Sequence, residues 1–229
     1  MRRSLLLLLS LAVLSCSPVN KYQSHPEVRS WENDIQKFEQ LDKTEKYPDD
    51  AVLFAGSSSI RLWNSLEKDM SPYNVIQRGY GCAKLSDFAV YASRIIDPHP
   101  CKAIVLFIAN DITGTKEDKT PKEDALIFKT ILKTIRKTHP VTPVFWIAIT
   151  PTSSRLKVWP EIQKANDQIK NICDRQKNSY FIKTNFAFLN ENGKPKDELF
   201  RDDKLHLTEK GYAVWTQIIR TELNNVLDK

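Results

Sequence analysis

Five short apolar runs alternate with segments of helical periodicity along most of this chain, and this alternation restricts the fold more than any other feature. The runs are rich in β-branched or aromatic residues and occupy 51–55, 73–76, 103–108, 144–149 and 180–182. The longer runs are typical of strands buried on both faces. Strands that alternate with helices favour a parallel sheet covered on both sides. We therefore predict an α/β fold with three layers and a five-stranded parallel sheet.

The helical segments carry apolar residues on one face and begin with recognisable signals. One pattern starts at Trp31, and Pro121 and Pro160 stand in the first turns of two more. Thr208 is a suitable N-cap for a last helix. A hydrophobic fraction of 41% and a charged fraction of 27% are typical of a globular chain. We expect a single folded domain over 30–229.

The first residues predict export from the cytoplasm. Two arginines precede an apolar run over 4–14, which is too short to span a bilayer as a helix. The run stops at Cys16, and its last residues resemble a bacterial lipobox, in which this cysteine becomes the lipidated first residue. We expect a lipoprotein signal peptide over 1–15 and a polar tether over 16–29.

The lipobox implies a location in the cell envelope. Ser17 follows the cysteine, and in Gram-negative lipoproteins a residue other than Asp there usually goes with transfer to the outer membrane. We expect secretion across the inner membrane, with the lipid as the only membrane attachment and the outer membrane as the destination. Plain cleavage without lipid stays open, because Leu14 lies one place later than in the commonest lipoboxes.

Charge and cysteine content exclude several kinds of partner. The net charge is +6, but Lys and Arg are scattered among Asp and Glu, so no nucleic-acid surface is predicted. Beyond Cys16, the cysteines are Cys82, Cys101 and Cys173, an odd set without the close spacing of a disulfide framework or a metal site. One pair can form in an oxidising compartment, but the sequence does not say which. We predict no metal and no cofactor, and the sequence does not indicate an oligomeric state.

Polar motifs follow several of the expected strands. In parallel sheets, chemistry gathers on loops after the carboxyl ends of the strands. Residues 56–59, Gly-Ser-Ser-Ser, follow the first strand, where a serine in a tight turn exposes its hydroxyl. Residues 79–82 follow the second strand and offer backbone N–H groups, and Asn110 ends the third. Each motif alone is also compatible with ordinary capping or an ordinary turn.

His206 is the one histidine of the four that does not precede a proline. Asp203 lies three residues before it, just ahead of the last helix. Over one turn, this spacing lets Asp203 accept a hydrogen bond from one ring nitrogen while the other faces a nucleophile.

The order Ser, Gly, Asn, Asp and His along the chain resembles the SGNH hydrolases, also called GDSL lipases or acylhydrolases. Residues 52–63 resemble the first block of a bacterial subgroup with Gly-Ser-Ser in place of Gly-Asp-Ser, and Ser58 matches its nucleophile. Residues 78–81 resemble the second block, 110–111 the third and 200–207 the fifth.

The resemblance implies a flavodoxin-like SGNH hydrolase fold and a serine esterase or acylhydrolase. Asp203 and His206 match the acid and base, while the N–H groups of Ser58 and Cys82 and the side chain of Asn110 match the oxyanion hole. The implied substrate is a small-molecule ester with a small acyl group, acetyl among the candidates, on a carbohydrate or a lipid.

Two departures from the family pattern keep another interpretation open. Cys82 stands where the second block usually has a second glycine. In the third block, either Ile108 replaces the usual glycine or the block is one residue short. The chain could then be a catalytically weak or inactive surface lipoprotein that binds a glycan or an acylated ligand in the same pocket. A nucleotide-binding α/β protein is a further alternative, but no third glycine follows at Lys84 to complete a phosphate fingerprint.

Overall fold

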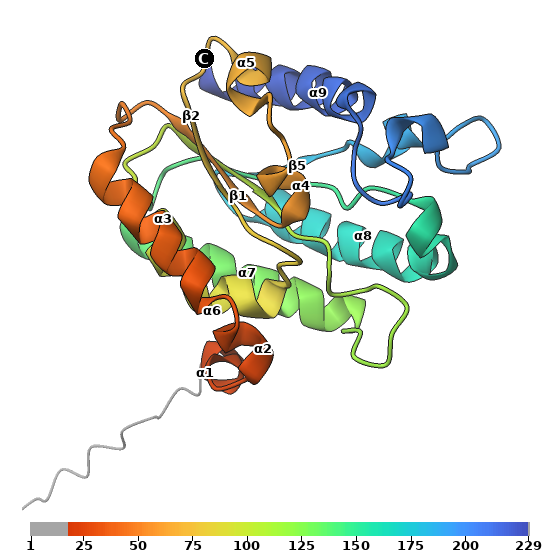
Figure 1. The fold of residues 1–229 in the computed structure, drawn as a ribbon, viewed down its shortest axis with the longest axis horizontal. Helices are drawn as coiled ribbons and strands as arrows, with labels where there is room; N and C mark the ends of the chain where they lie inside the picture. Colours follow the sequence, from red (N-terminus) through yellow and green to blue (C-terminus); the bar gives the residue numbers. More distant parts are fainter. Residues whose placement is uncertain (1–17, 229) are drawn as a thin grey trace, which may run out of the picture.

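The computed structural model describes residues 18–228 and is built around a five-stranded parallel sheet (Figure 1). The strand order is β2-β1-β3-β4-β5, and every neighbouring pair is parallel. The strands are β1 Val52–Gly56, β2 Val75–Gly79, β3 Ala103–Phe107, β4 Val144–Ile147 and β5 Ser179–Ile182. All five predicted strands are present, and the predicted fold class is confirmed.

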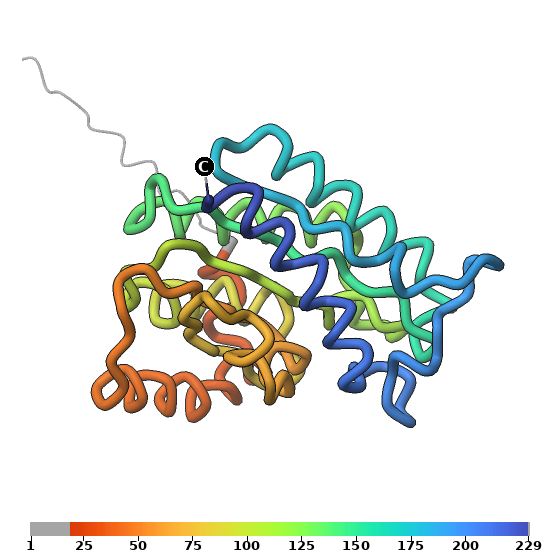
Figure 2. The backbone as a smooth tube through the Cα atoms, turned by 90° about the horizontal axis from the view of Figure 1, so that it is seen from above, coloured from red at the N-terminus to blue at the C-terminus, as the bar shows by residue number. Residues whose placement is uncertain are grey.

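Helices cover both faces of the sheet and complete three layers. In Figure 1, α3, α6, α7 and α8 lie below the sheet, and α5 and α9 lie above it. The helices are α1 Pro18–Gln23, α2 Pro26–Arg29, α3 Glu32–Thr44, α4 Ser58–Arg61, α5 Leu66–Met70, α6 Leu85–Ile96, α7 Pro121–Thr138, α8 Trp159–Arg175 and α9 Glu209–Leu227. Figure 2 shows α9 crossing the sheet diagonally, from the loop before residue 209 to the C-terminus.

Helices α7 and α9 each begin with a threonine whose side chain caps the first turn. The Thr120 side chain accepts a hydrogen bond from the Glu123 N–H while the Glu123 carboxylate accepts one from the Thr120 N–H, which closes a capping box at α7. Thr208 caps α9 by accepting from the Gly211 N–H. Helix α6 buries an apolar face together with the polar side chains of Ser86 and Asp87.

The expected tether over 16–29 is wrong for its described part, residues 18–29. These residues form α1 and α2, which pack on α6. Val28 is buried, and its carbonyl accepts a hydrogen bond from the Tyr91 hydroxyl at 3.1 Å. Helices of six and four residues are too short to show a periodic apolar face in the sequence. The expected signal peptide and Cys16 lie outside the described residues.

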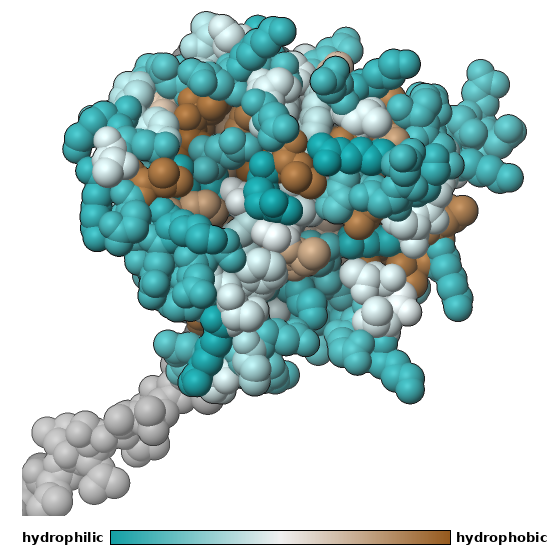
Figure 3. Space-filling model, viewed as in Figure 1, coloured by the Kyte–Doolittle hydropathy of each residue, from teal (hydrophilic) through white to brown (hydrophobic). Residues whose placement is uncertain are grey.

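The surface is mainly hydrophilic on the face seen in Figure 3, where hydrophobic side chains gather in small separate patches. The most exposed large hydrophobic side chains lie on different elements: Leu41, Leu126, Val141, Leu156 and Phe186. None of the helices within 18–228 has the length and apolarity needed to cross a membrane.

Helix α7 buries a carboxyl group in its first turn. Asp124 has no exposed surface, and neither of its carboxyl oxygens has a hydrogen-bond partner within the described chain. Burial, together with the nearby charge of Asp111, raises the pKa of Asp124 to about 9. The folded protein therefore holds this group in its neutral form at neutral pH.

Replacing Asp124 by asparagine should change the pH dependence of stability. An unfolded aspartate titrates at pH ~4. Between this pH and about 9, the folded protein therefore keeps a proton on Asp124 that the unfolded chain releases. Because of this difference in bound protons, the free energy of unfolding of the wild type falls as the pH rises. Asp124→Asn removes this pH dependence. The stability of Asp124→Asn relative to wild type should therefore increase with pH, as measured by urea denaturation across this window. Asp167→Asn, which removes an exposed carboxylate of α8, is the matched control and should show no such trend.

Candidate functional site

The turn after β1 presents Ser58 at the first position of α4. Gly56 has a φ of +137°, and a Cβ atom there would lie 2.0 Å from the Phe107 carbonyl oxygen of β3. A side chain is therefore excluded, and the turn can form only with glycine. Ser57 then donates its N–H to the same carbonyl at 2.8 Å, which fixes the turn to β3.

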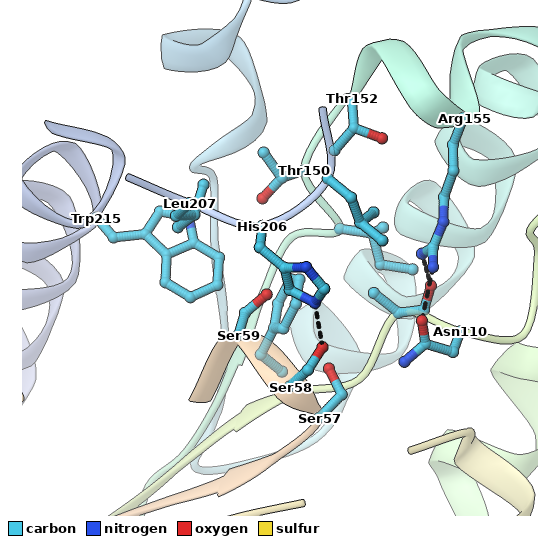
Figure 4. Close-up of a pocket in the computed structure, with 14 residues that line it drawn as sticks. Ser57, Ser58, Ser59, Asn110, Thr150, Thr152, Arg155, His206, Leu207 and Trp215 are labelled. Carbon is cyan, nitrogen blue, oxygen red and sulfur yellow. Dashed lines mark hydrogen bonds between the residues drawn. The ribbon is translucent and has the colours of Figure 1, made fainter. Parts of the chain in front are cut away.

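His206 and Asp203 meet Ser58 from the loop that precedes α9. The Ser58 Oγ lies 3.0 Å from His206 Nε2, and His206 Nδ1 lies 2.6 Å from a carboxylate oxygen of Asp203 (Figure 4 shows the first of these contacts). His206 lies 148 positions after the serine in the sequence, and the structure brings all three residues together in the predicted order. The arrangement can move a proton from the serine hydroxyl to the imidazole.

Asp203 is held as a carboxylate by the turn that it begins. Its other oxygen accepts the N–H groups of Leu205 and His206, both at 2.9 Å. Lys204, between them, has a φ of 53°, which tightens the turn. Burial raises the pKa of Asp203, but the His206 side chain and these backbone donors outweigh it and hold the pKa at about 2. Asp203 is therefore ionised across the neutral range and can orient the His206 ring.

Asn110 lies after β3, on the side of Ser58 away from Trp215 (Figure 4). Its Nδ2 donates one hydrogen bond to the Ala83 carbonyl at 3.0 Å, which leaves the second N–H of the amide for another acceptor. In Figure 4 this nitrogen faces the Ser58 side of the site. The assignment of this amide to the oxyanion hole stays a prediction.

Cys82 stands next to Ala83 in the turn between β2 and α6, and its side chain is exposed. An exposed thiol explains how a cysteine replaces glycine there without crowding the turn. The preceding Gly81 is more constrained, since a Cβ atom would lie 2.1 Å from the Trp31 ring. The assignment of the Cys82 N–H to the oxyanion hole stays a prediction. Cys82, Cys101 and Cys173 are all free thiols.

A small cavity opens beside the Ser58 hydroxyl. It has a volume of about 20 Å³, little more than one bound water needs. Its lining combines apolar side chains with a polar wall from the loop after β4. The residues that line it are Ser57, Ser58, Ser59, Phe107, Ala109, Asn110, Ile149, Thr150, Thr152, Arg155, Leu205, His206, Leu207 and Trp215.

The polar wall that follows β4 was not predicted from the sequence. Thr150, Thr152 and Arg155 belong to this wall, and Asn166 of α8 supports it through two hydrogen bonds to the Ile149 backbone, at 2.8 and 3.0 Å. Their position directly after the fourth strand was the available signal, because chemistry gathers at the carboxyl ends of parallel strands. Within 18–228, no group of three or more His, Cys, Asp or Glu side chains is arranged to hold a metal ion.

Solved structures share this fold at low sequence identity. A Streptococcus pneumonia protein provisionally named a platelet activating factor has a TM-score of 0.76 and 18% identity, covering 86% of this chain and 94% of its own. A GDSL-like lipase from Bacteroides thetaiotaomicron has a TM-score of 0.70 and 14% identity, covering 84% and 98%. A variant of Axe2, an acetyl xylan esterase from Geobacillus stearothermophilus, has a TM-score of 0.63 and 12% identity, covering 76% and 94%.

The sequence itself matches a family model. The model of the GDSL-like lipase/acylhydrolase family matches residues 44–214, which include the β1 turn, Asn110 and the Asp203–His206 loop. No curated protein sequence matches the chain. The match spans most of the chain, and the chain therefore belongs to the GDSL-like lipase/acylhydrolase family, a family of carboxylic ester hydrolases.

Proposed function

We propose that this protein is a serine esterase that removes small acyl groups, acetyl above all, from an oxygen-rich alcohol such as a carbohydrate. The observation that carries the proposal is the continuous chain of hydrogen bonds from Asp203 through His206 to Ser58, at 2.6 and 3.0 Å. Such a chain activates a serine hydroxyl for attack on an ester carbonyl.

In the proposed reaction, Ser58 Oγ attacks the carbonyl carbon while His206 Nε2 takes its proton. His206 then gives the proton to the departing alcohol, and water hydrolyses the acyl-enzyme with the same histidine as base. Asp203 stabilises the imidazolium. The developing oxyanion accepts hydrogen bonds from Asn110 Nδ2 and from the N–H groups of Ser58 and Cys82.

The size of the cavity supports a small acyl group. A volume of about 20 Å³ beside Ser58 leaves no room for an extended acyl chain inside the protein. The cavity lining includes the apolar side chains of Phe107, Ile149 and Trp215, which suit a methyl group. The acetyl xylan esterase among the structural neighbours is consistent with this choice.

The polar wall supports an oxygen-rich alcohol. The Thr150 hydroxyl lines the cavity, is buried and has no hydrogen-bond partner among the described residues. A buried hydroxyl without a partner is costly, and an oxygen of the substrate would satisfy it. A plain alkyl or lipid alcohol offers fewer such acceptors than a sugar.

A fluorophosphonate probe should label the wild-type protein at Ser58, because only an activated serine attacks such a probe. Ser58→Ala should remain unlabelled, and Ser59→Ala should still be labelled at residue 58, as mapped by mass spectrometry. Asp203→Asn should lower kcat on ester substrates by about 10⁴-fold, since the histidine loses its orienting carboxylate. Label at Ser57 or Ser59 would contradict the assignment of the nucleophile, and a complete lack of label would favour the non-catalytic binding protein.

Ester hydrolysis should depend on acyl length and on the alcohol. We expect kcat/KM to fall by about 10-fold or more from acetyl to butyryl esters of the same alcohol, because the cavity does not accept the longer chain. Thr150→Val, which removes the hydroxyl at nearly constant shape, should lower kcat/KM on an acetylated sugar by about 5-fold relative to an alkyl acetate. Faster hydrolysis of long-chain lipid esters would contradict the proposed carbohydrate substrate and indicate a lipid substrate instead.

We further propose that the protein is a lipoprotein of the cell envelope, anchored through Cys16. The support is the sequence of the export signal alone. Cys16→Ser should move the protein from the membrane fraction to the soluble envelope fraction on cell fractionation, while Cys101→Ser should stay with the membranes. Retention of Cys16→Ser on membranes in high salt would rule out the lipid anchor.

A further inference from the structure

Arg155 reaches the candidate oxyanion donor from a different loop. It lies in η1, the 3-10 helix Ser153–Val158 between β4 and α8. One terminal nitrogen of its guanidinium donates to Asn110 Oδ1 at 2.6 Å, and the other donates to the Ala109 carbonyl. Figure 4 shows both contacts, with the arginine side chain reaching down to Asn110.

We propose that Arg155 is a positioning residue for ester hydrolysis, holding the Asn110 amide so that its N–H points at the oxyanion. This inference rests on the proposed esterase function and deepens it. Arg155 lies outside the sequence blocks in which this chain resembles the family.

The two contacts fix both the place and the orientation of the Asn110 amide. An asparagine amide has two nearly equivalent flips, and only one presents its N–H groups to the site. Arg155 can donate but not accept, so it pairs only with the oxygen end of the amide. The Ala83 carbonyl accepts from the nitrogen end at 3.0 Å. The opposite flip would place two donors together and two acceptors together, and it is excluded.

The guanidinium also strengthens the donor that it orients. A hydrogen bond from a cation to the amide oxygen polarises the amide and makes its N–H groups more acidic. Both acceptors of Arg155 are uncharged oxygens, so its positive charge is not cancelled by a direct carboxylate contact. Burial lowers the pKa of Arg155, which is consistent with a cation held away from water.

This arrangement also explains how the third sequence block works without its usual glycine. Ile108 is fully buried and Ala109 is nearly so, which ties the chain before Asn110 to the core. Arg155 bridges Ala109 and Asn110 directly. The backbone N–H of the preceding residue, Ser154, donates to the Lys204 carbonyl at 3.3 Å. The η1 loop thus joins the Asn110 segment to the loop that carries His206.

A double-mutant cycle on an uncharged acetyl ester, such as p-nitrophenyl acetate, tests the proposal. Arg155→Met should lower kcat by about 10-fold to 100-fold, the loss expected when an oxyanion donor is displaced, and should change KM by less than about 3-fold. In the Asn110→Ala background the same substitution should lower kcat by less than about 3-fold, because there is no amide left to position. Arg155→Lys, which keeps the charge but not the bridge, should be intermediate.

The matched control is Lys157→Met, which removes a cation from the exposed face of the same η1 turn and should leave kcat and KM unchanged. The second readout is the side-chain amide resonance of Asn110 in ¹⁵N-labelled protein, assigned by its loss in Asn110→Ala. It should shift in Arg155→Met and Arg155→Lys but not in Lys157→Met, and the same spectra show whether each variant is folded.

Three outcomes would overturn the proposal. Equal losses of kcat from Arg155→Met with and without Asn110 would show that the arginine acts independently of the amide. A raised KM with unchanged kcat would make Arg155 a direct substrate contact. An unshifted Asn110 resonance would show that the bridge does not hold the amide. If the wild type hydrolyses no ester, the proposed function fails, and the resonance still decides whether Arg155 positions Asn110.

Discussion

The close pairing of β1 with β3 is the contact on which the rest of the site depends. Gly56 lies so near the Phe107 carbonyl that no side chain fits, and the Ser57 N–H binds that same oxygen. In the strand order 2-1-3-4-5, the chain continues to one side of β1 with β2 and to the other side with β3. The loops after β1 and β3 therefore diverge and leave a crevice. Ser58 and Asn110, the proposed nucleophile and oxyanion donor, lie on the two sides of that crevice.

The other half of the chemistry comes from outside the sheet. His206 and Asp203 lie on a loop before α9, and their position relative to Ser58 depends on how that loop folds on itself. The Asp203 carboxylate closes a turn onto two backbone N–H groups, with Lys204 in the left-handed region. The α9 helix then packs Trp215 against Phe107 of β3 at a ring separation of 4.8 Å. Local hydrogen bonds thus set the internal geometry of the acid and base, and core packing sets their distance from the serine.

Much of this could be predicted from the sequence because its signals are local. The buried strands have continuous apolar runs, and the starts of α7 and α9 have capping residues, so pattern and structure agree within a few residues. The contact between Asp203 and His206 was predictable because their spacing spans one turn. What escaped prediction depends on contacts between distant segments. Short helices such as α1 and α2 show no periodicity, and Arg155 reaches Asn110 across 45 positions of sequence.

The polar groups around Ser58 form two classes with different consequences. Asp203 and His206 are partly exposed, with side-chain exposures of 46% and 22%, so water screens them and their geometry depends on the turn that holds them. Asn110 and the Arg155 guanidinium are held by backbone carbonyls and by each other, in a part of the site where charge is less screened. Electrostatic stabilisation of a transition state is most effective when its donors are fixed before the reaction begins. In the proposed reaction, a fixed amide next to a partly solvated Asp203–His206 pair would therefore separate the two tasks of ester hydrolysis, with proton transfer on the α9 loop and charge stabilisation on the loops after β3 and β4.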